Sequence, residues 1–257
     1  MADVVRLEVE GGVGTIRLDR PPMNAIDTEV TRGLAAAADE ATRRDDVGAV
    51  VIWGGDKLFA AGADVKEMLP MTPREVTPMI ANLQEVFHAV EEIPKVTIAA
   101  ITGYCLGGGC ELALCADLRF AAENAKIGQP EILLGIIPGA GGTQRLPRLI
   151  APGRAKELIF SGRHVGAEEA LAIGLVNEVH PADEVYAKAV EAARRYAQGP
   201  RMALRAAKEA VNWGARGEFR AGVVLERGLF AGLFVTEDQK IGMRALLEKG
   251  QAAFQGR

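Results

Sequence analysis

Apolar and polar positions follow two different periods along the first half of the chain. Residues 4–18 alternate apolar and polar side chains on both sides of Gly11-Gly12, which predicts a hairpin. Short apolar runs then take turns with segments of helical period, the first of which Asp27 or Thr28 can cap. This alternation favours an α/β core with parallel strand pairing. We expect strands at 49–53, 95–101 and 118–121 and helices at 28–44, 73–92 and 109–116.

The second half, from residue 141, has an almost entirely helical pattern. The best boundary is Gly199-Pro200, which divides a catalytic core (1–199) from a helical C-terminal region (200–257) suited to oligomerisation or to acting as a lid. That region has apolar positions that would face the core or another subunit: Val223, Leu229, Phe230 and Phe234. We expect helices at 143–150, 153–160, 167–173, 182–197, 203–213, 219–234 and 238–254, and a strand at 176–179.

Composition excludes several classes of protein. With 257 residues, 49% of them hydrophobic, the chain is long enough to bury a sizeable core in one large or two small domains. A net charge of −4 gives no electrostatic footprint for nucleic acid. No apolar run is long enough to span a membrane, and residues 1–4 do not begin a secretory signal. Cys105, Cys110 and Cys115 lie in an apolar stretch, which predicts buried reduced thiols and a cytoplasmic location.

The residue inventory also limits the chemistry. The single serine, Ser161, is not in a G-x-S-x-G elbow, so a serine hydrolase of that kind is excluded. His88, His164 and His180 lack metal-ligand spacing and are expected on surfaces, and no metal site is predicted. Neither G-x-G-x-x-G nor a phosphate-binding G-x-x-x-x-G-K-[ST] occurs. Carboxylates remain for proton transfer, and backbone amides remain for stabilising an oxyanion.

Glycine is concentrated where this chemistry is predicted. Nine of the chain's 30 glycines lie between Gly103 and Gly142, and the runs at 107–109 and 139–142 each open a predicted helix. One interpretation is close packing of helices on a sheet. The other is an anion or oxyanion site, because N–H groups at a helix N-terminus are free and glycine admits a ligand close to the backbone. In such an oxyanion site, the loop at 61–64 would supply a second amide to the negatively charged oxygen.

Two glutamates accompany the glycine runs. Glu111 lies in the first turn of the helix after the first run, where it either stabilises the helix dipole or takes part in chemistry. Glu131 lies in an apolar segment, where it either pairs with a basic group or takes part in chemistry. Two acids beside two amides suit the addition of water next to a carbonyl, one acid taking a proton and the other giving one. Burial would raise their pKa values toward the working pH.

Three segments together carry a resemblance to a known family, and weaker similarity extends over nearly the whole chain. The chain resembles the crotonase superfamily and, within it, enoyl-CoA hydratase. The resemblance implies an α/β, ClpP/crotonase-like fold of repeated ββα units with a helical C-terminal region used in assembly, as a homotrimer or homohexamer. The segments are FAAGADVKEM (59–68), IAAITGYCLGGGCELA (98–113) and GQPEILLGIIPGAGGTQRL (128–146).

The resemblance also implies roles for individual residues. The amides of Ala63 and Gly108 would hold the oxygen of an acyl thioester, while Glu111 and Glu131 would hold a water and exchange protons with the substrate. Addition of water syn to a trans-2-enoyl-CoA would give a 3-hydroxyacyl-CoA. Coenzyme A would arrive as part of the acyl-CoA substrate, so no separate cofactor is expected. The implied contacts to coenzyme A are Ala61, Ala63, Asp64, Val65, Lys66, Gly108 and Lys249.

Two alternatives remain at this point. An enoyl-CoA isomerase or another enolate-forming enzyme of the same family commonly keeps only one of the two glutamates, and this chain has both. A binding scaffold for acyl-CoA would be expected to have lost an acid or the glycines. The chain departs from the usual hydratase pattern at 20–25, and at Leu246, where a phenylalanine is usual. Because the helix at 72–92 shows little match, the sequence predicts no preference for acyl chain length.

Overall fold

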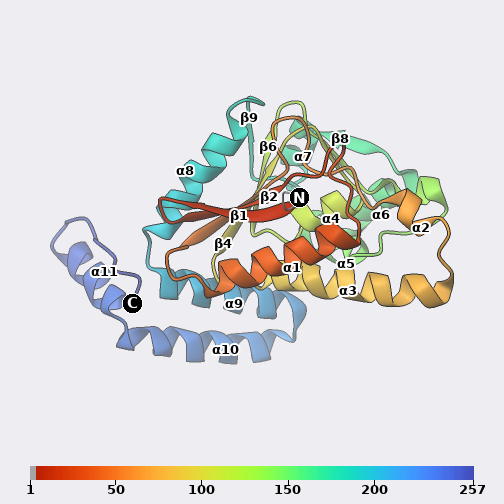
Figure 1. Ribbon diagram of the computed structural model, residues 1–257. Helices are drawn as coiled ribbons and strands as arrows, with labels where there is room; N and C mark the ends of the chain where they lie inside the picture. Colours follow the sequence, from red (N-terminus) through yellow and green to blue (C-terminus); the bar gives the residue numbers. More distant parts are fainter. Residues whose placement is uncertain (1–3) are drawn as a thin grey trace.

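The computed structural model describes residues 4–257, which form a body of strands and helices with a helical arm at its C-terminal end (Figure 1). The prediction that residues 1–4 do not begin a secretory signal falls mainly on residues 1–3, which lie outside the described residues. The body holds a six-stranded sheet of order β1-β2-β3-β4-β6-β9 and a three-stranded sheet of order β5-β7-β8. The large sheet consists of β1 (Val5–Glu10), β2 (Val13–Leu18), β3 (Ala49–Trp53), β4 (Val96–Ile101), β6 (Leu118–Ala122) and β9 (Glu178–His180).

The large sheet confirms the predicted hairpin and the predicted parallel core. Strands β1 and β2 pair antiparallel, whereas β2-β3-β4-β6-β9 all pair parallel. All five residues of β3 are buried, because helices cover both faces of the sheet. Val50 and Ile52 pack with α1 (Thr28–Arg43) and α3 (Pro73–Glu91), and the alternate residues pack with α8 (Val185–Ala197). Of the two predicted capping residues, Asp27 is the one that caps α1, and its side chain accepts a 2.8 Å bond from the Val30 N–H.

The small sheet was not predicted, because its strands of three residues are too short to show a period. It consists of β5 (Tyr104–Leu106), β7 (Lys126–Gly128) and β8 (His164–Gly166). The Gly107 N–H donates to the Gly128 carbonyl at 2.9 Å, which extends the β5-β7 pairing by one residue. This sheet therefore sets the first residues of α4 (Gly108–Ala113) beside the segment that leads into η1 (Pro130–Leu134).

Helix positions agree with the predictions better than helix ends do. The segment predicted at 238–254 is helical only to Leu247, so the prediction is wrong for its last seven residues. Lys249 has a φ of 55°, and the Gly250 N–H bonds the Ala245 carbonyl at 2.8 Å, which ends the helix in a Schellman turn. The remaining helices are α2 (Val65–Met68), α5 (Gly142–Ile150), α6 (Pro152–Ser161), α7 (Ala167–Ala172), α9 (Arg201–Arg216), α10 (Phe219–Gly232), η2 (Leu233–Val235) and α11 (Glu237–Leu247).

The C-terminal arm exposes apolar side chains. Helices α10 and α11 extend away from the sheets (Figure 1), and Phe230 is 62% exposed. Val223 and Phe234 are exposed as well, so these residues do not face the core of their own chain. Contact with another subunit stays a prediction, as does the division of the chain at residues 199 and 200. In residues 4–257 no helix is long and apolar enough to cross a membrane.

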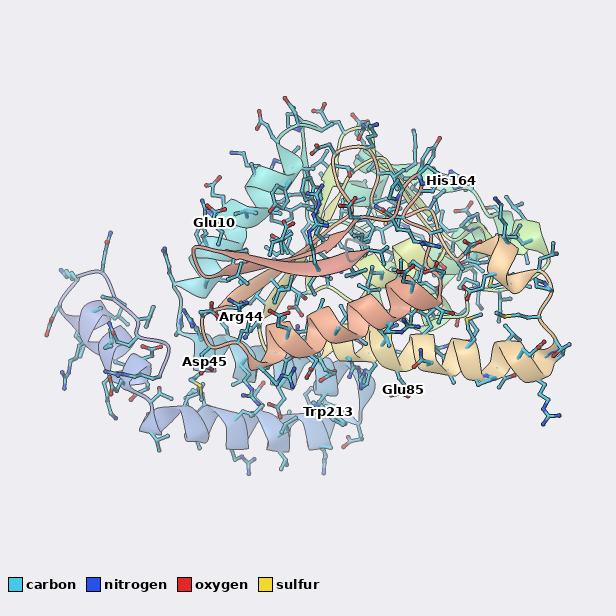
Figure 2. All side chains as sticks on the ribbon, in the orientation of Figure 1. Glu10, Arg44, Asp45, Glu85, His164 and Trp213 are labelled. Carbon is cyan, nitrogen blue, oxygen red and sulfur yellow. The ribbon has the colours of Figure 1, made fainter. Side chains whose placement is uncertain are left out.

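Two further predictions concern single residue types. All three cysteines are buried and free of disulfide bonds, as predicted. His88 and His164 are exposed, also as predicted, and Figure 2 shows His164 at the surface of the body, whereas His180 is half-buried. Among the described residues, no group of three or more acidic, histidine or cysteine side chains is arranged to hold a metal ion.

Some of the glycines concentrated between Gly103 and Gly142 serve close packing, and Gly109 gives a test of this. A Cβ added at Gly109 would lie 2.3 Å from the Ala60 carbonyl oxygen, a backbone atom that cannot move aside alone. We expect Gly109→Ala to lower the free energy of unfolding by about 3 kcal/mol, the upper end of ordinary overpacking costs. The control is Gly153→Ala on α6, where a Cβ meets nothing within 4 Å. Equal urea midpoints for the two variants would contradict the prediction.

Candidate active site

The candidate site lies where the loop after β3 meets the first turn of α4. The Leu106 N–H donates to the Ala60 carbonyl at 3.0 Å, which ties this loop to β5 immediately before α4 begins. Ile26 bridges the same loop at Ala63. A Cβ built on Gly108 would lie 3.6 Å from the Ala63 nitrogen, so the two backbone segments approach closely. The structure therefore brings together the two residues whose amides the sequence singled out.

Both of these amides are free to bind a ligand. Gly108 is the first residue of α4, where a helix leaves its N–H without an internal partner. Over residues 4–257, neither the Gly108 N–H nor the Ala63 N–H donates a hydrogen bond to a protein acceptor. The preceding residue, Gly107, has a φ of 50°, which a side chain would strain. Two neighbouring free amides are the usual components of an oxyanion hole.

Glu111 is held by the second glycine run. Its side chain is nearly fully buried, and Oε1 accepts bonds from the Ala140 N–H at 2.8 Å and the Gly142 N–H at 2.7 Å. The sequence predicts an anion site at this run, and the anion that the structure places there is the chain's own carboxylate. A Cβ at Gly142 would come within 2.6 Å of the Gln129 Oε1 atom and 3.0 Å of the Glu111 Oε1 atom. Glycine at this position therefore makes room for the buried carboxylate.

Glu131 reaches the same place from η1, but nothing holds its carboxylate. Both of its oxygens are buried and accept no hydrogen bond from another of the described residues. A Cβ at Gly107 would lie 3.1 Å from its Oε1 atom, which places the carboxylate over the start of α4. The alternative that Glu131 pairs with a basic group is wrong within residues 4–257, where it forms no ion pair.

The two carboxyl groups have different electrostatic surroundings. Burial raises the pKa of Glu131 to about 7, and the charge of Glu111 contributes in the same direction. Burial also raises the pKa of Glu111, but the N–H groups of Gly142 and Ala140 oppose that rise, as does the charge of Arg145. Glu111 is therefore the better stabilised of the two as a carboxylate, and Glu131 is the one more readily kept protonated.

Aliphatic side chains complete the cavity. It encloses about 120 Å³, and among residues 4–257 the only ionisable side chains that line it are Glu111 and Glu131. The rest of the lining is backbone and hydrocarbon, so a ligand group seated there meets two acids in an otherwise apolar space. The aliphatic side chains are those of Val65, Met68, Ile80, Leu83, Leu134, Ile136 and Ile137.

The residues predicted to contact coenzyme A divide into three groups. Ala61, Ala63, Val65 and Gly108 line the cavity. Asp64 caps the short helix α2, where its side chain accepts a 2.9 Å bond from the N–H of the exposed Lys66. Lys249 follows α11, which lies on the opposite side of the molecule from α2 (Figure 1), so the structure does not bring Lys249 to this cavity within one chain.

The groups that position Glu111 were not apparent from the sequence. The run at 139–142 was expected to present free amides, whereas the amides of Ala140 and Gly142 are already used by the protein. Gln129, which is fully buried beside Glu111, was not singled out either. The sequence does show two glycine runs, each followed by a helix. Their spacing does not reveal which run keeps its N–H groups free and which run binds Glu111.

Comparison with known proteins decides the family. The family described as enoyl-CoA hydratase/isomerase matches residues 8–257. The chain belongs to this family. The predicted crotonase-type fold is therefore confirmed for this chain, and so is the prediction of an enzyme of the enoyl-CoA hydratase/isomerase family.

Relatives within the enoyl-CoA hydratase/isomerase family cover most or all of the chain. A probable enoyl-CoA hydratase of Mycobacterium tuberculosis, echA8, is 42% identical over 253 residues, which are 98% of each chain. A second from the same organism, EchA17, is 47% identical over 203 residues, which are 79% of this chain and 78% of that protein. The crystal structure of an enoyl-CoA hydratase from Geobacillus kaustophilus covers 100% of this chain and 98% of its own, with a TM-score of 0.96 at 35% identity. One from Bacillus anthracis covers 99% and 100%, with a TM-score of 0.93 at 38% identity.

Proposed function

We propose that this protein is an enoyl-CoA hydratase, which adds water syn across a trans-2-enoyl-CoA to give a 3-hydroxyacyl-CoA. The observation that carries the proposal is the pair of buried carboxyl groups, Glu111 and Glu131, in one cavity beside two free backbone amides. The names of the relatives support it, since the two from Mycobacterium tuberculosis are probable enoyl-CoA hydratases.

The amides of Ala63 and Gly108 are assigned to the thioester oxygen. Attack of water at Cβ pushes negative charge onto that oxygen, and two N–H donors fixed by the fold stabilise this enolate without rearranging. One such donor contributes about 3–4 kcal/mol in enzymes where it has been removed. The assignment rests on the closeness of Gly108 to the Ala63 nitrogen and on the absence of protein partners for both N–H groups in residues 4–257.

The two acids are assigned opposite roles because their surroundings differ. Glu111, held as a carboxylate by two N–H groups, would take the proton from the attacking water. Glu131, whose pKa burial raises to about 7, would carry a proton and give it to Cα. A pair of carboxyl groups with pKa values moved apart is the arrangement that one acid and one base require.

Coenzyme A is assigned to the substrate, so the proposal needs no separate cofactor. Its pantetheine end would pass the loop of Ala61, Ala63, Val65 and Lys66. Lys249 would meet a phosphate of coenzyme A from a neighbouring subunit, since its own chain holds it far from the cavity (Figure 1). A homotrimer or homohexamer, assembled through the exposed apolar residues of the C-terminal arm, stays a prediction. So does a cytoplasmic location.

The proposal is tested with enoyl thioesters of increasing chain length, beginning with crotonyl-CoA. Hydration removes the double bond that is conjugated with the thioester, so we expect the ultraviolet absorbance of the enoyl thioester to fall. An isomerase would instead raise this absorbance when it is given a 3-enoyl-CoA and leave crotonyl-CoA unchanged. Tight binding of acyl-CoA without turnover of any of these substrates would identify a binding scaffold.

A further inference from the structure

We infer that Arg145, anchored by Glu91, is a positioning residue that fixes the backbone loop at 139–142 and thereby the catalytic carboxylate of Glu111. The inference rests on the proposed function for its kinetic consequences, although the contacts that carry it are independent of the reaction. It assigns a role to a cluster of side chains behind the cavity, on α3, α5 and α9, none of which lines the cavity itself.

Arg145 binds the loop at a peptide group between the two N–H groups that donate to Glu111. Its Nη1 donates to the Ala140 carbonyl at 3.0 Å. That carbonyl lies between the Ala140 N–H and the Gly142 N–H, the two groups that bind the Glu111 Oε1 atom. A Cβ at Gly141 would lie 2.2 Å from Nη1, so the guanidinium occupies the space of any side chain there. A shift of Arg145 therefore moves both donors together.

A second side chain holds the neighbouring peptide from α3. The Gln84 Nε2 atom donates to the Gly139 carbonyl at 2.7 Å. This carbonyl belongs to the same peptide unit as the Ala140 N–H, so the bond aims that N–H at Glu111. Two successive peptides of the loop are thus each fixed by a side chain on the face away from the cavity.

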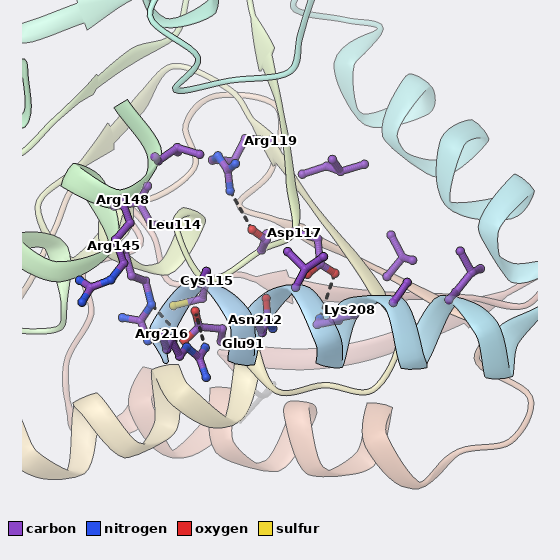
Figure 3. A pocket seen from close by; sticks show the side chains of 18 of the residues that line it. Glu91, Leu114, Cys115, Asp117, Arg119, Arg145, Arg148, Lys208, Asn212 and Arg216 are labelled. Carbon is purple, nitrogen blue, oxygen red and sulfur yellow. Dashed lines mark hydrogen bonds and ion pairs between the residues drawn. The ribbon is translucent and has the colours of Figure 1, made fainter. Parts of the chain in front are cut away.

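The guanidinium of Arg145 is itself fixed by α3 and, through α3, by helix α9 of the C-terminal region. Its Nε and Nη2 atoms lie 3.2 and 2.8 Å from Oε2 of Glu91. The other oxygen of Glu91, Oε1, pairs with Arg216 at 2.9 Å. Figure 3 shows Glu91 between the two arginines at one end of a cavity that α5 and α9 line. The end of α9 therefore shares an anchor with the loop that holds Glu111.

The positive charge of Arg145 supports the catalytic role of Glu111 in addition to the contacts that hold the loop. Charged and titratable groups surround Arg145 from every element packed against it. They are Glu91 and His88 on α3, Arg216 on α9, Glu111 on α4, Cys115 just after α4, and Arg148 on the same helix as Arg145. The positive charge of Arg145 lowers the pKa of Glu111 and so favours the carboxylate that takes the proton from water. Loss of that charge would raise the pKa of Glu111, and the acid side of the pH profile would move to higher pH.

The matched control is one turn further along the same helix. Arg148 is exposed, bonds only Gln144 within its own helix and forms no ion pair in residues 4–257. We expect Arg145→Gln to lower kcat for crotonyl-CoA by about 10- to 100-fold with KM changed by less than about threefold, the result of misplacing a catalytic group. Arg148→Gln should stay within about twofold of the unaltered protein in both constants.

Two further readouts separate positioning from a purely structural role, and a second variant is available if the first does not fold. Arg145→Lys keeps the positive charge but lacks the planar set of donors of the guanidinium. It should therefore restore the acid limb of the pH profile seen in the unaltered protein, while kcat stays as low as in Arg145→Gln. Hydrogen exchange at the Ala140 and Gly142 amides should be faster in Arg145→Gln than in Arg148→Gln, whether or not substrate is turned over. If Arg145→Gln does not fold, Gln84→Ala replaces it, with an expected fall in kcat of about 3- to 10-fold for one lost contact to the loop.

Two results would overturn the inference. The first is a folded Arg145→Gln protein with the kcat and the acid limb of Arg148→Gln. The second is unchanged exchange at both amides in Arg145→Gln, or unchanged kcat in Gln84→Ala where that variant is used. If the unaltered protein hydrates no enoyl-CoA, the proposed function fails, whereas the exchange measurement still decides whether Arg145 holds the loop.

Discussion

Glu111→Gln is expected to lower kcat for the hydration of crotonyl-CoA by about 10³-fold or more, near the upper part of the range for removing a general acid or base. The substitution is mild for the fold, because the amide oxygen of glutamine can still accept the bonds from the Ala140 and Gly142 N–H groups. What it removes is the ability to take a proton from water. KM for crotonyl-CoA should therefore change little while kcat falls.

The control for Glu111→Gln is Glu85→Gln, on the side of α3 that faces solvent (Figure 2). It makes the same chemical change away from the cavity and should leave kcat within about twofold of the unaltered protein. Both variants should show the same urea midpoint to within a small margin. A Glu111→Gln protein that keeps full activity would refute the assignment of Glu111 as the base.

Glu131→Gln is expected to lower kcat by a similar factor, about 10³-fold, for a different reason. Glutamine resembles the protonated acid in shape and neutrality but has no proton to give to Cα. In the unaltered protein, Glu131 with a pKa of about 7 should produce a fall in kcat/KM above pH 7, as the acid ionises. The residual activity of Glu131→Gln should lack this alkaline limb. Persistence of the limb in that variant would assign it to another group.

The same substitution has a consequence for stability that does not involve substrate. The pKa of Glu131 is about 4.5 when unperturbed and about 7 in the folded protein. Between these values the folded state holds a proton that the unfolded state has lost, so the free energy of unfolding falls as the pH rises. Glutamine cannot ionise, so Glu131→Gln should gain stability over the unaltered protein as the pH rises from about 4.5 to about 7. The gain is on the order of 2 kcal/mol, less than for a fully buried carboxyl. Urea unfolding of both proteins across this pH range measures it, and a constant difference between them would contradict the prediction.

Some elements were predictable because their signal is local. The apolar run of β3 and the capping residue of α1 fix those elements within a few residues, and both were found where predicted. The end of α11 was not predictable in this way. The residue that takes the left-handed conformation there is Lys249, whereas a glycine usually marks such an end.

The small sheet and the site behind it were decided by pairing over long distances in sequence. Strands β5 and β8 have only three residues each, and β7 becomes a strand because it lies between them. The Glu131 carboxylate reaches Gly107 because η1 follows β7, which pairs beside β5. No period in the sequence encodes that meeting.

By itself, the sequence determined the chemistry that was available: carboxylates for proton transfer, among them two glutamates that accompany glycine runs opening helices. The tertiary structure alone decided how the two runs differ. The run that starts α4 leaves the Gly108 N–H free. In the run that leads into α5, the N–H groups of Ala140 and Gly142 donate to Glu111. The physical reason is that a backbone N–H is the same donor in either run. Its role is set by the acceptor that the fold places within about 3 Å of it.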